Sequence, residues 1–472
     1  MTDVQTPEPT HQEQRARRGW ALTLASIGSF LVVLDMLVVV TALTSVQRDL
    51  GASIDELEWT VNGYTLSFAA LLMTAAAIGE RHGRRRVYAA GLVLFAAASA
   101  GCALAPDIGW LIGARIVQGI GAATVMPLAL GLLNAAYPPH RRGWAMGVYG
   151  TVTGVAAVLG PMVGGAITEG LAWQWIFWIN VPIGVLLAAL VLAKAVGDAG
   201  RRAPLDPVGL VLVSGGAALL VWALVRGNLD GWASPSVLTA GAGGVGLAVG
   251  FVLWERRYAG AMIPMRLYGS RGFAAGNAAV FALNGSMAAG LFLMAQYQQV
   301  VAGLGPFEAG LRLLPWGAPP LLIALRAGSL ADRWGARPLV VVGLFLQAAG
   351  MGWIALAAGP DTGYGAIVVP MTAAGVGFAL AIPAVTTAVV GAVGPSDIGI
   401  ASGAFTTMRQ LGGAFGVAVA VAVFTGFGEG RTAAGFSAGT VAAFAALAIF
   451  SLIGGLAALA IPRRPRNAPG SP

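Results

Sequence analysis

The sequence has little of what most metalloenzymes and nucleotide-binding proteins use. Its 472 residues contain one cysteine, Cys102, and three histidines, His11, His82 and His140. A single cysteine excludes an intramolecular disulfide, and three scattered histidines form no dense metal cluster. The only lysine, Lys194, lies in Leu-Ala-Lys-Ala, so no Gly-x-x-x-x-Gly-Lys-Ser/Thr phosphate loop is present. We therefore expect no metal, no cofactor and no ATP hydrolysis.

Charge is also scarce, because only 10% of the residues are charged while 57% are hydrophobic. This balance excludes a soluble globule of this length and predicts a chain embedded in a lipid bilayer. The net charge of +8 is compatible with nucleic acid binding. In a chain that crosses a membrane many times, however, arginines more often hold loops in the cytoplasm, so no nucleic acid partner is expected.

Long apolar stretches are the dominant feature of what is present. Each is long enough to span the bilayer core of roughly 30 Å, which needs about 20 residues. The first is too long for a signal-peptide core and should remain as an anchor. The fold class expected is therefore all-α integral membrane, with 14 transmembrane helices in groups of six, two and six. The stretches are 20–43, 59–78, 87–105, 108–136, 144–168 and 175–196, then 208–225 and 237–254, then 273–296, 309–325, 338–358, 365–390, 401–424 and 438–461.

The grouping predicts two pseudo-symmetric six-helix bundles with two inserted helices between them. Arginines fall on alternate loops, which places those loops and both termini in the cytoplasm. The predicted parts are a cytoplasmic tail (1–19), the N-terminal bundle (20–200), two inserted transmembrane helices (201–260), the C-terminal bundle (261–461) and a second cytoplasmic tail (462–472). The acids assigned to the outer loops are Asp49, Asp55, Glu56, Glu58, Asp107, Glu169, Asp230, Asp361 and Glu429.

A short charged loop occurs twice, with its acid, arginine and glycine at the same spacing. The second copy follows the first by 252 residues (332 − 80 = 335 − 83 = 252). A repeated loop on one side of the membrane is what a transporter built from two related halves would show. The residues are Glu80, Arg81, Gly83, Arg84 and Arg85 in the first copy, and Asp332, Arg333, Gly335 and Arg337 in the second.

These loops resemble the signature loop of the major facilitator superfamily, Gly-x-Leu-Ala-Asp-Arg-x-Gly-Arg-Lys/Arg. The second copy departs from this pattern at Ala336, and the first at Ala76 and Glu80. An acid beside cations at the ends of packed helices can form charge-assisted bonds in one conformation and lose them in another. We therefore expect both loops to latch the cytoplasmic side when the central cavity faces outward.

Asp35 is the only carboxylate that the apolar pattern places well inside a span. Buried acids in membranes are costly and usually functional. Asp35 lies about 22 Å from the inner end of the first span, and Arg115 about 10 Å from the outer end of the fourth, so their depths agree in a core of roughly 30 Å. We expect Asp35 to carry the coupled proton and Arg115 to tune it. The alternative is a permanently paired structural acid.

Two helix motifs strengthen the resemblance. Leu111 to Ala123 is similar to the superfamily's fourth-helix motif, Leu-x-x-x-Arg-x-x-Gln-Gly-x-Gly-Ala-Ala, and includes Arg115 and Gln118. In the fifth span, proline removes a backbone hydrogen bond and glycines allow close helix approach. That stretch resembles the motif of drug/proton antiporters, which implies export and a role in sealing the cavity. Its residues are Gly160, Pro161, Gly164 and Gly165.

Two further stretches are similar to the fourteen-helix drug/proton antiporter family. They are Trp173 to Gly184, and Gln296 to Gln299 followed by Pro306 to Pro315. The family usually has arginine where Gln174 stands, so an outer ion pair made by that arginine is not expected here. The resemblance covers residues 20–461.

Several polar side chains inside spans are candidates for contact with substrate near the midplane. Interhelical hydrogen bonds explain Asn62 or Asn284 equally well. The case for a functional contact is stronger for Arg409. An unpaired arginine in a membrane costs several kcal/mol, so its guanidinium needs an acid, carbonyls, water or an anionic ligand as a partner. The candidates are Asn62, Tyr64, Gln118, Asn284, Gln296 and Arg409.

The function expected from these residues and from the resemblance is proton-coupled efflux of small amphipathic drugs, antibiotics or secondary metabolites across the bacterial cytoplasmic membrane. A proton-coupled importer of a polar nutrient on the same fold is the main alternative. A membrane-embedded enzyme would need a second intramembrane carboxylate, a histidine pair or a nucleophile with its base, and the apolar pattern shows none. The chain is therefore expected not to be an enzyme.

Overall fold

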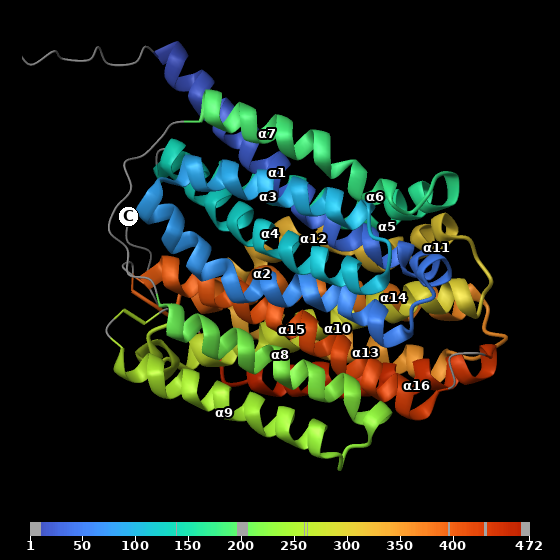
Figure 1. The fold of residues 1–472 in the computed structure, drawn as a ribbon. Helices are drawn as coiled ribbons and strands as arrows, with labels where there is room; N and C mark the ends of the chain where they lie inside the picture. The colour runs from blue at the N-terminus through green and yellow to red at the C-terminus, as the bar shows by residue number, and fades with distance from the viewer. Residues whose placement is uncertain are drawn as a thin grey trace, which may run out of the picture.

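The computed structural model describes residues 11–137, 139–195, 206–258, 260–261, 263–394, 397–428 and 432–463. These residues form a bundle of long, roughly parallel helices and contain no β-strand (Figure 1). The first half comprises α1 (His11–Leu50), α2 (Ile54–His82), α3 (Arg84–Ala103), α4 (Ile108–Ala136), α5 (Pro139–Gly170), α6 (Trp175–Trp178) and α7 (Asn180–Lys194).

The remaining helices follow the predicted order. A pair of helices comes first, then a 3-10 turn, η1, and then the second half. Their bounds are α8 (Pro207–Asp230), α9 (Pro235–Arg257), η1 (Met265–Gly269), α10 (Arg271–Val300), α11 (Pro306–Arg312), α12 (Leu314–Trp334), α13 (Ala336–Ala357), α14 (Tyr364–Val390), α15 (Ile398–Phe427) and α16 (Ala433–Ala458).

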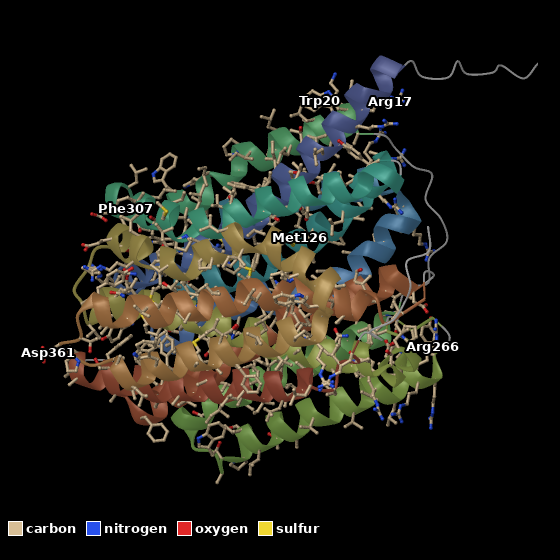
Figure 2. All side chains as sticks on the ribbon, turned by 180° about the vertical axis from the view of Figure 1, so that it is seen from behind. Arg17, Trp20, Met126, Arg266, Phe307 and Asp361 are labelled. Atoms are coloured by element: carbon tan, nitrogen blue, oxygen red, sulfur yellow. The ribbon has the colours of Figure 1, made fainter. Side chains whose placement is uncertain are left out.

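Twelve segments of the described chain are long and apolar enough to cross a membrane, with α6 and α7 counted as one segment. The all-helical membrane fold is therefore confirmed. Helices α2 and α12 are not among the twelve, although both pack within the bundle. The two ends of the bundle are named here by residues labelled in Figure 2: the Phe307 end, which also holds Asp361, and the Arg266 end, where Arg17 also lies.

Local signals in the sequence explain where several helices begin. The Ser53 side chain accepts a hydrogen bond from the Glu56 amide, and the Glu56 carboxylate accepts one from the Ser53 amide at 2.8 Å. This reciprocal capping box starts α2 at Ile54. Asp107 caps α4 in a similar way by accepting from the Trp110 amide at 2.8 Å.

The two halves meet along two seams. Helix α2 packs along α15 on one side, and α5 packs along α11 and α12 on the other. Helix α8 packs beside the first seam, since its Ala217 and Val221 join an apolar cluster with Leu66 of α2 and Leu411 of α15. Helix α9 lies farther out and packs mainly on α8 (Figure 1). The predicted pair of extra helices therefore sits at one flank of the bundle.

Candidate functional site

Asp35 lies at the junction of three helices of the first half. Its side chain is 1% exposed and accepts hydrogen bonds from Arg115 Nη1 at 2.7 Å, Gln118 Nε2 at 2.9 Å and Asn180 Nδ2 at 2.6 Å. These donors come from α4 and α7, whereas Asp35 belongs to α1. Three donors, one of them charged, compensate the buried carboxylate, as a charge at this depth requires.

Arg115 is held from several sides at once. Its Nε donates to the carbonyl of Thr60 on α2 at 3.1 Å, and its Nη1 also donates to Gln118 Oε1 at 2.6 Å. The guanidinium lies 4.2 Å from the centre of the Tyr64 ring, within the range of a cation–π contact. We call Asp35, Arg115, Gln118, Asn180 and Tyr64 the Asp35 network. It joins α1, α2, α4 and α7.

The predicted pairing of Asp35 with Arg115 is present in this geometry. Tyr64 and Gln118, predicted as contacts for substrate, lie instead in the Asp35 network, where the Tyr64 hydroxyl donates to the Val32 carbonyl at 3.3 Å. No role was predicted for Asn180 from the sequence, although it is the polar residue between two apolar runs of the sixth span. Its buried side chain is the third donor to Asp35.

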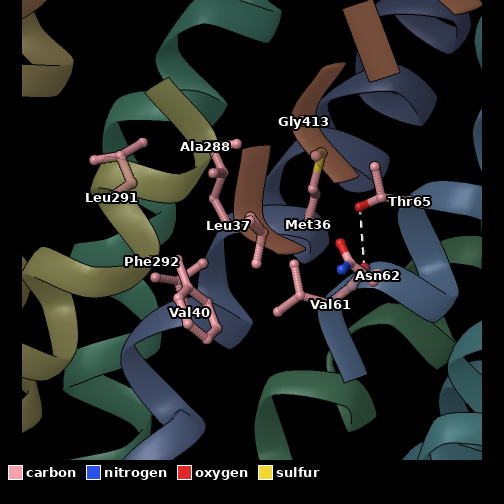
Figure 3. Close-up of a pocket in the computed structure, with 11 residues that line it drawn as sticks. Met36, Leu37, Val40, Val61, Asn62, Thr65, Ala288, Leu291, Phe292 and Gly413 are labelled. Atoms are coloured by element: carbon pink, nitrogen blue, oxygen red, sulfur yellow. Dashed lines mark hydrogen bonds between the residues drawn. The ribbon is translucent and has the colours of Figure 1, made fainter. Parts of the chain in front are cut away.

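A pocket lies beside the network, between the two halves (Figure 3). It contains about 400 Å³ of space not filled by atoms, including the part open to its surroundings. The lining residues are Met36, Leu37 and Val40 of α1, Val61, Asn62 and Thr65 of α2, Ala288, Leu291 and Phe292 of α10, and Gly413 and Val417 of α15.

The pocket is apolar with one amide in its wall. Among its lining residues, Asn62 and Thr65 carry polar side chains, and the Thr65 hydroxyl is already used by the Val61 carbonyl at 3.0 Å. Met36 and Leu37 follow Asp35 directly in α1, so the pocket wall and the Asp35 network share a helical turn.

The other predicted substrate contacts lie around the pocket rather than in its wall. Asn284 Nδ2 donates to the Arg409 carbonyl at 2.8 Å and so joins α10 to α15. Gln296 is buried on α10, one turn from Phe292. Arg409 is half-buried, and its Nε has no hydrogen-bond partner within the described part of the chain. It lies one turn of α15 from Gly413 of the pocket.

The assignment of Glu58 to an outer loop was wrong. The capping box begins α2 four residues before Glu58, so this carboxylate lies within the helix and is 0% exposed. Its Oε1 accepts from Asn62 Nδ2 at 2.6 Å, whereas its Oε2 has no partner in the described structure. Asp35 is therefore not the only carboxylate inside the bundle. The signal that identifies Glu58 is the Ser53-x-x-Glu56 capping box ahead of it.

The glycines of the fifth span pack where no side chain fits. A Cβ atom on Gly165 would lie 2.5 Å from Phe307 Cα, and one on Gly310 would lie 2.9 Å from the Pro161 carbonyl carbon. A Cβ on Gly160 would lie 2.7 Å from Leu37 Cβ, and one on Gly164 would lie still closer to the Val38 carbonyl oxygen.

The contacts of Gly165 and Gly310 close the seam between α5 and α11 at the Phe307 end, whereas those of Gly160 and Gly164 pack α5 against α1. The Glu169 carboxylate adds a hydrogen bond from the Phe307 amide at 3.1 Å. Thr41 donates to the Pro161 carbonyl at 3.2 Å, and Thr44 and Gln299 are hydrogen-bonded between α1 and α10. Both halves therefore meet directly at this end of the pocket.

The two repeated loops share one backbone conformation. Gly83 has φ +94° and Gly335 has φ +85°, values that favour glycine in both copies. Arg84 donates to the Gly131 carbonyl at 3.2 Å and Arg85 to the Ala195 carbonyl at 3.4 Å, while Arg81 is exposed and Arg337 half-buried. The side chains of Glu80, Asp332 and Arg333 lie outside the described residues.

Gln174 replaces the expected arginine without losing the contact between helices. Its Nε2 lies 3.4 Å from Asp49 Oδ2, and the Trp173 indole donates to the same oxygen at 2.7 Å. At the Phe307 end, Asp49 thus accepts hydrogen bonds from two neutral donors.

Comparison with known proteins identifies the class of this site. Residues 25–417 match the sequence profile of the Major Facilitator Superfamily, and the chain belongs to that superfamily. The fold is similar to that of a bacterial homologue of the human lysosomal transporter Spinster in an inward-facing, unoccupied conformation. The TM-score is 0.67 at 16% identity, covering 97% of this chain and 98% of the other. The chain is a multi-pass membrane protein with a transporter fold.

Similar sequences include antibiotic export and resistance proteins. The chain is 36% identical over 477 residues to the cephamycin export protein CmcT of Amycolatopsis lactamdurans. This match covers 99% of this chain and 98% of that protein. It is 32% identical over 467 residues to the methylenomycin A resistance protein of Streptomyces coelicolor, with 98% and 97% covered. It is 36% identical over 419 residues to the puromycin resistance protein of Streptomyces alboniger, with 87% and 82% covered.

Proposed function

We propose that this chain exports amphipathic organic molecules, such as antibiotics, across the bacterial cytoplasmic membrane in exchange for protons. The observation that carries the proposal is the Asp35 network beside a pocket lined by both halves. A buried acid with a cationic partner can exchange a proton when their spacing changes. A pocket between two halves can face either side of the membrane in turn. The relatives named above support export rather than import.

We further propose fourteen spans, with α2 and α12 added to the twelve apolar segments and both termini in the cytoplasm. Arginines on alternate loops support this orientation. The Phe307 end then faces outward, and the seal between α5 and α11 closes the outer side. The repeated loops at Gly83 and Gly335 lie on the cytoplasmic side, where we propose that their charged residues form a latch that breaks on inward opening.

Transport in vesicles tests the function directly. In everted membrane vesicles with an acidic interior, we expect the chain to accumulate puromycin or methylenomycin A, and a protonophore should abolish the accumulation. The measurement is the uptake of labelled compound against vesicles without the chain. Uptake into right-side-out vesicles with an acidic exterior would show an importer. Absence of proton-dependent movement of both compounds in either orientation would contradict the proposal.

The flank formed by α8 and α9 is expected to take no part in binding. No residue of either helix lines the described pocket. Single cysteines at Val40 and Leu291 should be protected from maleimide by puromycin, whereas cysteines at Leu219 and Val245 should not. Native Cys102 is 0% exposed and gives little background. Protected positions concentrated in α8 and α9 would place the binding site at the flank instead.

A further inference from the structure

Glu58 is a buried carboxyl group that the Asp35 network does not use. It lies one helical turn into α2, about 6 Å along the axis from Ile54. Asn62, one turn further, belongs to the pocket wall. Glu58 therefore stands between the Phe307 end and the pocket.

Among the described side chains, no cation pairs with Glu58. Within the described structure no arginine, lysine or histidine nitrogen forms an ion pair with it, and the charged group that acts on it is the like-charged Asp55 of the same helix. Arg115 is paired with Asp35, and Arg226 with Asp230. Among the side chains that the structure describes, the charged groups on helices packed against α2 are Arg17, Arg18, Asp35, Arg48 and Asp49 on α1, Arg84, Arg85 and Arg86 on α3, Arg115 on α4, Arg226 and Asp230 on α8, and Arg409 on α15.

The hydrogen bonds around Glu58 lack one donor. Asn62 Nδ2 donates to Glu58 Oε1 at 2.6 Å, which leaves Glu58 Oε2 and Asn62 Oδ1 without partners among the described residues. Both atoms are acceptors when Glu58 is ionised. A single proton on Oε2 turns that oxygen into a donor for which Oδ1 is an acceptor. Burial without a countercharge favours the same neutral form.

We infer that Glu58 is a second proton-binding group of this chain and holds its proton toward the Asn62 amide at the pocket wall. The proton comes from water at the Phe307 end and adds to Oε2, so that carboxylate and hydronium become carboxylic acid and water. Its departure leaves the Asn62 amide oxygen free to face a molecule in the pocket. The inference rests on the proposed function in one respect only, namely that this proton is among those exchanged for substrate.

Infrared spectroscopy of the purified full-length chain in lipid tests the proton site without any transport. At neutral pH we expect a carboxylic acid C=O band that shifts in D₂O and is lost in Glu58→Gln. The matched control is Glu56→Gln, because glutamine also completes a capping box, and this variant should keep the band. In Asn62→Leu the band should move to higher frequency, since the carbonyl loses its amide donor. A Glu58→Gln spectrum identical to that of the native chain would overturn the inference.

The coupling role has a separate readout. The number of protons moved per puromycin in proteoliposomes should fall by about one in Glu58→Gln and remain unchanged in Glu56→Gln. An acid band at Glu58 with an unchanged proton count would make Glu58 a structural acid and overturn its part in exchange. Because the band is measured without puromycin, failure of export and failure of the proton site are distinguished.

Discussion

Replacing Asp35 with asparagine is expected to reduce proton-driven accumulation of substrate to the level of protein-free liposomes. Asparagine has the shape of aspartate, and its Oδ1 can still accept from Gln118 and Asn180, while its Nδ2 takes the place of the oxygen that accepts from Arg115. It cannot bind and release a proton. The variant should therefore fold and bind puromycin while the pH gradient no longer drives the compound. The measurement is uptake under an imposed pH gradient.

Exchange without a gradient separates coupling from collapse of the protein. Asp35→Asn should still exchange labelled for unlabelled puromycin across the liposome membrane, because that reaction needs alternating access but no net proton movement. Asp361→Asn, which removes a carboxylate at the protein surface, is the control and should retain both activities. Full gradient-driven accumulation by Asp35→Asn would contradict the assignment and direct attention to Glu58 and to Glu308, the next acid at a span boundary.

A valine at Gly165 is expected to open the seal at the Phe307 end and arrest the transport cycle. A Cβ there would meet backbone atoms of Pro306 and Phe307, which cannot rotate away as a flexible side chain can. Overpacking typically costs about 1–3 kcal/mol, which corresponds to a shift of about 5- to 150-fold toward conformations in which α5 and α11 are apart. Accumulation of substrate should fall in parallel.

Labelling from outside the cell measures that shift. A cysteine at Leu291 in the pocket wall should react faster with a membrane-impermeant maleimide in Gly165→Val than in the native background. Gly170→Val is the matched control, since a Cβ at Gly170 of the same helix would meet no atom within 4 Å. Equal labelling rates in the two variants would show that contact between α5 and α11 does not control access at this end.

The sequence predicted the order of helices and the central ion pair because both depend on simple quantities. Apolar length defines a span, and a rise of 1.5 Å per residue places Asp35 and Arg115 at similar depths. These quantities do not identify the other hydrogen-bond partners of Asp35. Gln118 and Asn180 converge on Asp35 from α4 and α7, and their meeting depends on helix rotation and packing, which one sequence does not give.

Glu58 shows how a hydropathy pattern can err at the end of a span. Asp55 and Glu56 make the surrounding residues look like a polar loop, so the apolar stretch seemed to begin at Trp59. Acidic residues are in fact favourable in the first turn of a helix. The capping box between Ser53 and Glu56 carries that information and places Glu58 inside α2. Cap motifs therefore bear on charge burial in membrane helices as well as on helix boundaries.

Helix α8 makes the two seams of the bundle mechanically unequal. It packs against α2 of one half and α15 of the other through Ala217 and Val221, so it connects the two halves across that seam. Among the described residues, neither α8 nor α9 packs against α5 or α12. If the halves move relative to each other during transport, we expect the α2–α15 side, which packs against α8, to move less than the α5–α12 side.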